Sequence, residues 1–339
     1  MIRVKKEEFT TVLNVNPQQI MPIDRYFFLY PNLKLIDEGV KPKELPIMEF
    51  YKQRRKNWRG GITNLTRTKN IVAIYKDLKT RGYNIYGKRK PIRVVVEKGG
   101  IISCYDGHNR LCMLHHLGVT KPIQVKAYLE PEIKELIKIK KQRGPKGFYQ
   151  PIQHPIFQKT PLSRGSPVER LKYLTLCLRA DTFDSILDIG CYTGYHSVNL
   201  ARQFNCKATG VEMTDECHAI SVGLKDWWKR YYGDVTFRHG DFRELPLKKH
   251  DVTICLSVLH HYLKQSPAAV INFVNRIERL TRKFAIIEVA GNVPQMRKVK
   301  PTPTAAVWRK ILNRTNFCKV THLKGSPGTR HWFELRRRV

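Results

Sequence analysis

The sequence predicts an α/β protein with two domains: a doubly wound parallel sheet with an antiparallel last strand in the second half, and a smaller α+β domain in the first half. Three observations lead to this prediction. The chain has 339 residues, which is comfortable for two domains. After residue 166, short apolar runs alternate with helical patterns, as in parallel sheets. Between residues 92 and 128, strand signals flank a tight turn and one helical pattern.

The second half opens with an apolar run at 185–189, which predicts a buried strand. A turn with Gly190 and Gly194 follows, and then a helical pattern through Phe204. A strand, a glycine loop and a helix in this order are typical of the start of a nucleotide-binding α/β domain, because glycine lets the backbone approach a ligand. The loop has one glycine fewer than the dinucleotide fingerprint, which argues against a nicotinamide cofactor.

Acidic residues end the next two predicted strands. Glu212 follows Gly190 by 22 residues, where a carboxylate can accept hydrogen bonds from two ribose hydroxyls. Asp241 follows the run at 235–237 and can meet an adenine amino group. A fourth apolar run, 252–256, leads into the segment 257–262.

These ordered motifs resemble those of class I S-adenosylmethionine-dependent methyltransferases, over roughly residues 166–339. The resemblance implies a Rossmann-like methyltransferase sheet and S-adenosyl-L-methionine as the cofactor. The alternative is a similar sheet with no ligand or with a decayed site. The residues that we expect to bind the cofactor are Asp188, Gly190, Cys191, Gly194, Glu212, Asp241 and Ser257.

Further elements complete the predicted sheet. Ser166-Pro167-Val168-Glu169 fits a capping box that opens a helix. A helix is expected over about 268–281 and a fifth strand over 284–289. The pattern at 317–335, interrupted by Gly325-Ser326-Pro327-Gly328, predicts a terminal hairpin.

Candidate catalytic residues lie at the C-terminal ends of the fourth and fifth strands: His260, His261 and Glu288, with Tyr262 beside them. A sugar hydroxyl needs a general base to accept a methyl group, and histidine can serve near neutral pH. Alternatively, one histidine packs under the loop and the other shapes the cofactor pocket. The segment 257–260 lacks the Asn/Asp-Pro-Pro-Tyr/Phe turn of amino-group DNA methyltransferases, and the chain has no Pro-Cys pair, so DNA base methylation is disfavoured. Leu259-His260-His261 looks more like enzymes that act on small molecules, sugars or tRNA wobble bases.

The first half contains a hairpin signal at 92–105, directly followed by Asp106-Gly107-His108-Asn109-Arg110 and a helical pattern. A helix N-terminus offers free backbone N–H groups, and an arginine adds a forked donor, so the turn suits phosphate. It resembles the Asp-Gly-x-x-Arg turn of the ParB/sulfiredoxin-like family, over residues 9–130. Members bind nucleotides, which implies an ATP- or CTP-type ligand at Asp106, Gly107, His108, Asn109 and Arg110. Some members transfer phosphate using an acid elsewhere; Asp24, Asp37 and Glu38 are candidates here. The simpler alternative is that Asp106 caps the helix and pairs with Arg110.

We therefore expect a ParB/sulfiredoxin-like domain at 1–130, a basic linker rich in proline and glycine at 131–165, and the methyltransferase domain at 166–339. The start of the linker, 132–141, can form a helix with a basic face. The segment 46–89, with basic residues between 52 and 59, fits the first domain less well and can be an insertion.

The formal net charge is +34 and is spread over both halves. Such a field attracts polyanions such as nucleic acid, although a generally basic set of proteins in the source would also explain it. The eight cysteines form no Cys-x-x-Cys pair, so we expect small buried thiols and no metal site. No apolar run is long enough for a membrane span and the N-terminus has no signal core, so we expect a soluble cytoplasmic protein.

Three functions fit these observations. The first is a methyltransferase for a nucleic-acid or phosphorylated substrate, with a nucleotide- or phosphate-binding first domain. The second is a glycan or small-metabolite O-methyltransferase fused to a phosphotransferase-like domain. The third is a nucleic-acid-binding module whose methyltransferase fold is not catalytic. The oligomeric state is not predicted by the sequence.

Overall fold

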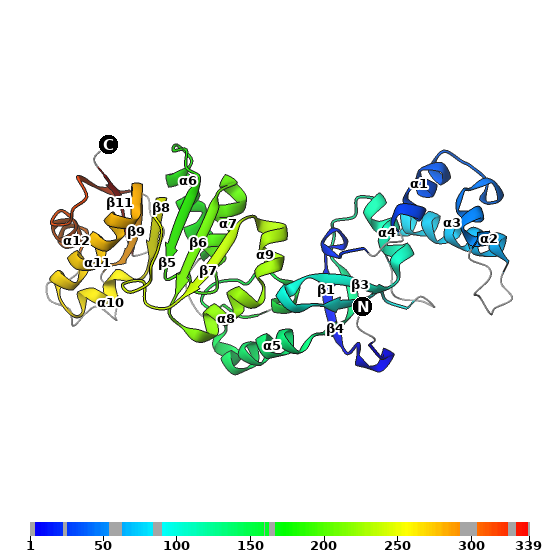
Figure 1. Ribbon diagram of the computed structural model, residues 1–339, viewed down its shortest axis with the longest axis horizontal. Helices are drawn as coiled ribbons and strands as arrows, with labels where there is room; N and C mark the ends of the chain where they lie inside the picture. Colours follow the sequence, from blue (N-terminus) through cyan, green and yellow to red (C-terminus); the bar gives the residue numbers. More distant parts are fainter. Residues whose placement is uncertain are drawn as a thin grey trace. The chain divides into compact units, whose positions relative to one another are not determined.

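The computed structural model describes residues 4–22, 26–53, 63–83, 90–158, 160–162, 167–291, 304–324 and 330–337. The chain forms two compact units, Met1–Glu135 and Leu136–Val339 (Figure 1). Four features of the sequence analysis lie outside the described residues: Asp24, the basic residues at 54–59, Ser166 and the turn at 325–328.

The second unit is built on a seven-stranded sheet with the order β10-β11-β9-β8-β5-β6-β7. The five strands from β9 to β7 are parallel, β11 is antiparallel to β9, and β10 is antiparallel to β11. This confirms the predicted parallel sheet with an antiparallel end. The strands are β5 (Ser185–Ile189), β6 (Lys207–Glu212), β7 (Val235–His239), β8 (His250–Leu256), β9 (Thr281–Ala290), β10 (Lys319–Leu323) and β11 (Arg330–Arg336).

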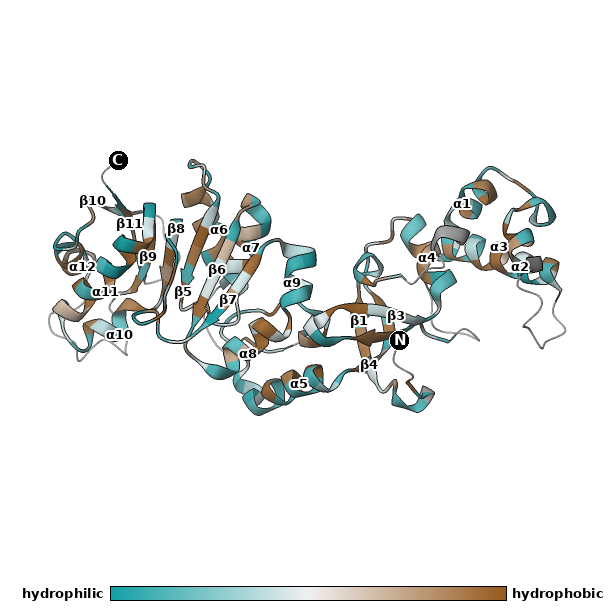
Figure 2. Ribbon diagram, viewed as in Figure 1, coloured by the Kyte–Doolittle hydropathy of each residue, from teal (hydrophilic) through white to brown (hydrophobic). Residues whose placement is uncertain are grey.

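Helices cover both faces of this sheet, as expected of a doubly wound fold. One core joins α10, α11 and α12 to the sheet, and another joins α6 and α7 to the opposite face. Every residue of β8 is buried, which is typical of a central parallel strand, and hydrophobic residues concentrate in β5 and β8 (Figure 2). The helices are α6 (Pro167–Leu178), α7 (Tyr195–Phe204), α8 (Asp215–Gly223), α9 (Lys225–Tyr232), α10 (Leu259–Leu263), α11 (Pro267–Leu280) and α12 (Ala305–Leu312).

Local signals explain where several helices begin. In α11, the Ser266 side chain accepts a hydrogen bond from the Ala269 amide, and Pro267 occupies the first turn. Helix α6 begins at Pro167, as its sequence predicts. Six of the eight cysteines are buried, which confirms the expectation of small core thiols.

The crossover pattern opens a crevice at one edge of the sheet. Chain order reverses at β5, whose neighbours are β6 on one side and β8 on the other. The connections from such a pair diverge to opposite faces, so a ligand site forms beyond the carboxyl ends of the strands. Asp188, Glu212 and Leu256 stand at these ends.

The first unit contains a four-stranded sheet with the order β1-β4-β2-β3. The predicted hairpin is confirmed: β2 pairs antiparallel with β3, and Gly99 and Gly100 in the turn have φ angles of 82° and 89°. Helix α3 packs against α4. The elements are β1 (Thr11–Val15), α1 (Tyr26–Asp37), α2 (Ile47–Gln53), α3 (Asn64–Arg81), β2 (Arg93–Val96), β3 (Ile102–Asp106), α4 (His108–His116) and β4 (Ile123–Leu129).

The segment expected to be a linker, 131–165, differs from that expectation in its described part. It begins with helix α5 (Pro131–Arg143), and from Leu136 onward it belongs to the second unit. Phe148, Ile156 and Phe157 are buried, and the Phe148 amide donates to the Pro161 carbonyl at 3.0 Å. The apolar residues between the prolines and glycines make the segment fold back and pack.

In the described part of the chain, no helix combines the length and apolar character needed to cross a bilayer.

Candidate functional site

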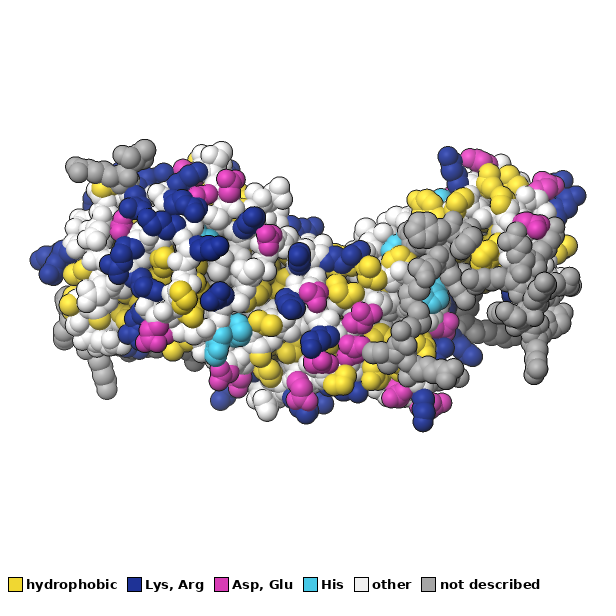
Figure 3. All heavy atoms as spheres, in the orientation of Figure 1, with side chains coloured by type: hydrophobic (Ala, Val, Ile, Leu, Met, Phe, Trp, Pro, Cys, Tyr) yellow, Lys and Arg dark blue, Asp and Glu magenta, His cyan; other side chains and the backbone are white. Residues whose placement is uncertain are grey.

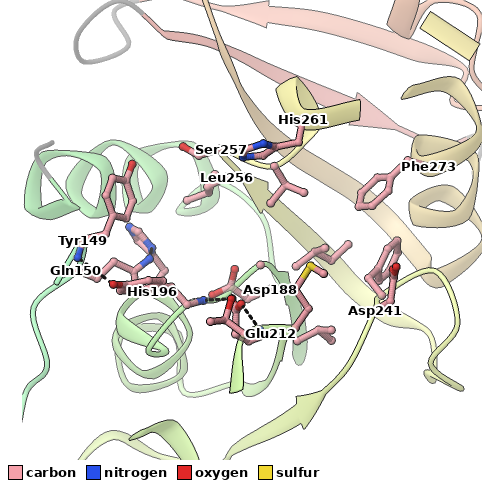
Figure 4. Close-up of a pocket in the computed structure, with 18 of the residues that line it drawn as sticks. Tyr149, Gln150, Asp188, His196, Glu212, Asp241, Leu256, Ser257, His261 and Phe273 are labelled. Atoms are coloured by element: carbon pink, nitrogen blue, oxygen red, sulfur yellow. Dashed lines mark hydrogen bonds between the residues drawn. The ribbon is translucent and has the colours of Figure 1, made fainter. Parts of the chain in front are cut away.

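A pocket of about 300 Å³ lies at the carboxyl ends of the central strands of the second unit (Figure 4). Tyr149 and His196 stand on one side of the view, and Asp241 and Phe273 stand on the opposite side. Three carboxylates and one arginine are among the lining residues: Asp188, Glu212, Asp241 and Arg170.

The glycine loop requires its glycines. Gly190 and Gly194 have φ angles of 71° and 85°, in the left-handed region. A Cβ on Gly190 would lie 2.6 Å from Val258 Cγ2, and one on Gly194 would lie 2.6 Å from the Phe237 ring. Of the predicted loop residues, Gly190 lines the pocket, whereas Cys191 and Gly194 shape the loop without being among its lining residues.

Glu212 joins the loop to the end of β6. Its Oε2 accepts a hydrogen bond from the Tyr192 amide at 2.9 Å, and its Oε1 accepts one from the Thr214 amide at 2.8 Å. Each carboxylate oxygen has a second lone pair, and Glu212 lines the pocket. Tyr192, which it holds, has a positive φ of 57°, so the loop backbone here is strained.

Asp188 is almost fully buried at the end of β5, with 2 % of its surface exposed. Its Oδ2 accepts a hydrogen bond from Ser197 Oγ at 2.6 Å. Burial raises the pKa of Asp188 to about 7, and the nearby Glu212 adds to the effect while the Ser197 hydrogen bond opposes it. A cation in the pocket would favour the ionised form.

Asp241 is held in place by Arg243. Arg243 Nε and Nη2 donate to Asp241 Oδ2 at 2.9 and 2.5 Å, and these hydrogen bonds lower the pKa of Asp241. The carboxylate lines the pocket beside Phe242 and Met213. Met213 leaves 68 % of its surface exposed, so an apolar face is available next to the carboxylates.

Ser257 lines the pocket, and Glu288 lies behind it. Ser257 has a φ of 61°, and its Oγ donates to Glu288 Oε2 at 3.0 Å and accepts from Arg330 Nη1 at 3.0 Å. Glu288 is fully buried and pairs with Arg170 and Arg330, whose Nε atoms lie 3.5 and 3.3 Å from its Oε1.

The expected place of Glu288 beside the cofactor therefore needs correction. Glu288 is not among the lining residues of the pocket, because its side chain turns into the interior toward two arginines. Burial raises its pKa, and the two guanidinium groups oppose this rise.

The two histidines of α10 differ in their access to the pocket. Their ring centroids are 4.2 Å apart, but His261 lines the pocket and is exposed, whereas His260 is not among the lining residues. Burial lowers the pKa of His260 to about 3 and also lowers that of His261. Both rings are therefore neutral at neutral pH, and of the two only His261 is a lining residue of the pocket.

Sequence reasoning missed one wall of the pocket. Tyr149, Gln150 and Arg170 line it, and Tyr149 Oη accepts a hydrogen bond from Arg170 Nη1. Gln150 Oε1 accepts from the Tyr195 amide at the start of α7, and its Nε2 lies 3.2 Å from His196 Nδ1. A signal for Arg170 was present, since it shares the apolar face of α6 with Leu174 and Leu178 at spacings of four.

In the first unit, Asp106 ends β3 and the turn enters α4. Burial raises the pKa of Asp106, but hydrogen bonds from Arg93, at 2.8 Å, and from the Gly107 amide lower it overall. Arg110 donates to the Lys90 carbonyl, and Asp106 pairs with Arg93 and not with Arg110 as the simpler alternative had it. Gly107 has a φ of 93°, and a Cβ there would lie 2.9 Å from Arg110 Nη2.

The remaining residues of this turn, His108 and Asn109, lie half-buried in the first turn of α4. Asp37, one of the expected acids, accepts hydrogen bonds from Tyr75, Lys79 and His116. Burial raises its pKa, but these bonds lower it to about 2. Asp37 is thus a paired carboxylate on α1.

No group of three His, Cys, Asp or Glu side chains that could hold a metal ion occurs in the described ranges.

Comparison with known proteins finds a family match within the second unit. Residues 181–325 match the family model of a methyltransferase domain. No curated protein matches the chain.

Solved structures similar to this chain include magnesium protoporphyrin IX methyltransferase (ChlM) from Synechocystis PCC 6803 with bound SAH (19 % identity, TM-score 0.40, covering 50 % of this chain and 82 % of that one). WbdD is similar at 20 % identity and a TM-score of 0.43, over 59 % of this chain and 46 % of that one. Small RNA methyltransferase HEN1 is similar at 16 % identity and a TM-score of 0.44, over 55 % of this chain and 27 % of that one. Likeness at this level carries no information on the substrate.

The second unit therefore contains a region, residues 181–325, that matches a methyltransferase domain.

Proposed function

We propose that the pocket of the second unit binds S-adenosyl-L-methionine and that His261 assists methyl transfer to an acceptor hydroxyl of a nucleic-acid or phosphorylated substrate. The observation that carries the cofactor assignment is the match of charges. S-adenosyl-L-methionine has a sulfonium, an ammonium and a carboxylate group, and the pocket is lined by three carboxylates and one arginine. Opposite charges meet favourably in a site of low dielectric constant.

Each lining group has a part in this proposal. Glu212 accepts hydrogen bonds from the ribose hydroxyls with its free lone pairs, and Asp241 accepts one from the adenine amino group. Asp188 stabilises the cationic end, and Arg170 binds the carboxylate. The exposed thioether of Met213 offers an apolar contact to the adenine ring. Cys191 and Gly194 shape the loop, and Ser257 forms the wall near the reacting centre.

S-adenosyl-L-methionine supplies an electrophilic methyl group. His261 accepts the proton of the acceptor hydroxyl, because its imidazole is neutral and lies on the pocket wall. Aromatic side chains on both sides of the pocket, Tyr149 on one and the paired Tyr262 and Phe273 on the other, exclude water and orient the acceptor. His260 packs beneath His261 and keeps the turn of α10 in place.

Two features support a phosphorylated or nucleic-acid acceptor. The net charge is +34, and Lys and Arg side chains gather over the part of the second unit that carries β8, β9 and β11 (Figure 3). The first unit offers the turn from Asp106 to Arg110 at the start of α4, which we propose as a nucleotide or phosphate site of a ParB/sulfiredoxin-like domain, with an ATP- or CTP-type ligand. The proposed partner is therefore a polyanion.

A glycan or small-metabolite hydroxyl is the second candidate acceptor. It is favoured by the sequence Ser257-Val258-Leu259-His260 in place of an Asn/Asp-Pro-Pro turn.

Transfer of label from methyl-labelled S-adenosyl-L-methionine to separate pools of RNA, DNA and glycans tests these proposals, with Glu212→Ala as the control. Label in a nucleic-acid pool that is lost in the variant supports the first acceptor. Label confined to glycans or small molecules overturns it in favour of the second. Label that persists in Glu212→Ala contradicts the assigned pocket.

A further inference from the structure

We propose that Glu288 is a positioning residue that holds Arg170 and Ser257 in the wall of the cofactor pocket. This inference rests on the proposed function of that pocket. It assigns to Glu288 a role other than that of a general base, for which its place in the sequence made it a candidate.

Glu288 connects three elements that are far apart in the chain. From β9, its carboxylate reaches Arg170 of α6, Arg330 of β11 and Ser257 in the loop after β8. Its backbone takes part as well, because the Ser257 amide donates to the Glu288 carbonyl at 3.1 Å. Main chain and side chain of one residue thus fix both the position and the hydroxyl of Ser257.

Glu288 and Arg170 are buried, so the loss of either partner leaves the other without a replacement. Glu288 is 0 % exposed and Arg170 is 7 % exposed, so little water is available to replace a lost partner. A buried guanidinium without its carboxylate is strongly unfavourable and turns toward another acceptor. Without Glu288, Arg170 would lose this ion pair and keep its hydrogen bond to Tyr149, so that its guanidinium would no longer be held from the side of β9.

Ser257 depends on the same carboxylate for a second reason. Its φ of 61° lies in the left-handed region, which is unfavourable for a residue other than glycine. The hydrogen bonds of its amide and hydroxyl to Glu288 compensate for this strain. The hydrogen bonds between Ser257 and Glu288 therefore hold the loop from Ser257 to His261 in its position at the pocket.

The position of Glu288 fits a positioning role and does not fit proton transfer. A general base needs an open path to the acceptor. Glu288 is not among the lining residues, and Ser257 and two arginines occupy its surroundings. His261, which lines the pocket, has the access that Glu288 lacks.

The test is S-adenosylhomocysteine binding by isothermal titration calorimetry to the full chain. The variants are Glu288→Gln, Arg170→Gln, the double variant, and Glu278→Gln as a matched control. Glu278 also forms an ion pair, with Arg337 at 2.8 Å, and does not line the pocket. We expect Glu288→Gln and Arg170→Gln each to weaken binding roughly tenfold to a hundredfold, as for hydrogen bonds to charged groups.

The double variant is expected to bind no more weakly than the weaker single variant, since both changes disable the same guanidinium. Glu278→Gln is expected to bind as the wild type does, even if its melting temperature falls. If Glu288→Gln does not fold, Glu288→Asp, which keeps the charge on a shorter side chain, takes its place with the same expected loss.

Binding of the folded Glu288 variant with wild-type affinity would overturn the inference, as would losses in Glu288→Gln and Arg170→Gln that multiply in the double variant. If the wild type itself binds no S-adenosylhomocysteine, the proposed function of the pocket fails instead.

Discussion

Replacing Asp188 by asparagine should change how the stability of the second unit depends on pH. The folded-state pKa of Asp188 is about 7, against an ordinary value of 3.8. Between these values the folded protein holds a proton that the unfolded chain has released, so stability falls as pH rises and levels off above pH 7. The full difference of about three pH units corresponds to about 4 kcal/mol.

Asparagine has nearly the same shape and can still accept the hydrogen bond from Ser197, but it does not titrate. The stability of Asp188→Asn relative to the wild type should therefore rise by about 2 kcal/mol between pH 5 and pH 6.5, at about 1.4 kcal/mol per pH unit. Buried His196 and His260 titrate with the opposite sign, so the two proteins must be compared at each pH.

Urea unfolding followed by tryptophan fluorescence measures this difference, because four of the five tryptophans, Trp227, Trp228, Trp308 and Trp332, are buried in the second unit. Parallel pH profiles for the two proteins would show that Asp188 is ionised throughout and would refute the reasoning. A saturating cationic cofactor should flatten the wild-type profile, since it favours the ionised carboxylate.

Other changes test the loop and the catalytic assignment. Gly194→Ala should destabilise the second unit by roughly 1–3 kcal/mol, because its Cβ would lie 2.6 Å from the Phe237 ring at a φ of 85°; an unchanged melting temperature would contradict this. His261→Gln should lower kcat roughly 100-fold or more with unchanged S-adenosylhomocysteine affinity, whereas equal losses in His260→Gln would argue against a single base. Gln150→Ala should weaken cofactor binding about fivefold in calorimetry, because α7 loses the acceptor of its first amide; full affinity would show that this wall is not part of the site.

The sheet and its acidic strand ends were predictable because their signals are local. The apolar run at 185–189 predicts a buried strand, and the glycine turn after it predicts a ligand loop. The acids after the next strands predict the polar edge of the site. Because carboxyl ends of neighbouring parallel strands meet at one edge, Asp188 and Glu212 had to lie close together.

The wall formed by Tyr149, Gln150 and Arg170 was not predictable in the same way. Gln150 acquires its role by capping α7 from more than 40 residues away, which composition cannot indicate. That the side chain of Glu288 lies behind the pocket, and not in its lining, was not predictable for a related reason. Nearly all of β9 is buried on both faces, so alternation along the strand does not tell which side chains reach the pocket.

The most direct test of the central claim, that this pocket is the cofactor site, is calorimetric titration of S-adenosylhomocysteine into the wild type and Glu212→Ala. We predict one molecule bound per chain by the wild type and an affinity at least tenfold lower in a folded Glu212→Ala, since two hydrogen bonds to a charged group are lost. Equal affinities, or no binding by the wild type, would contradict the claim.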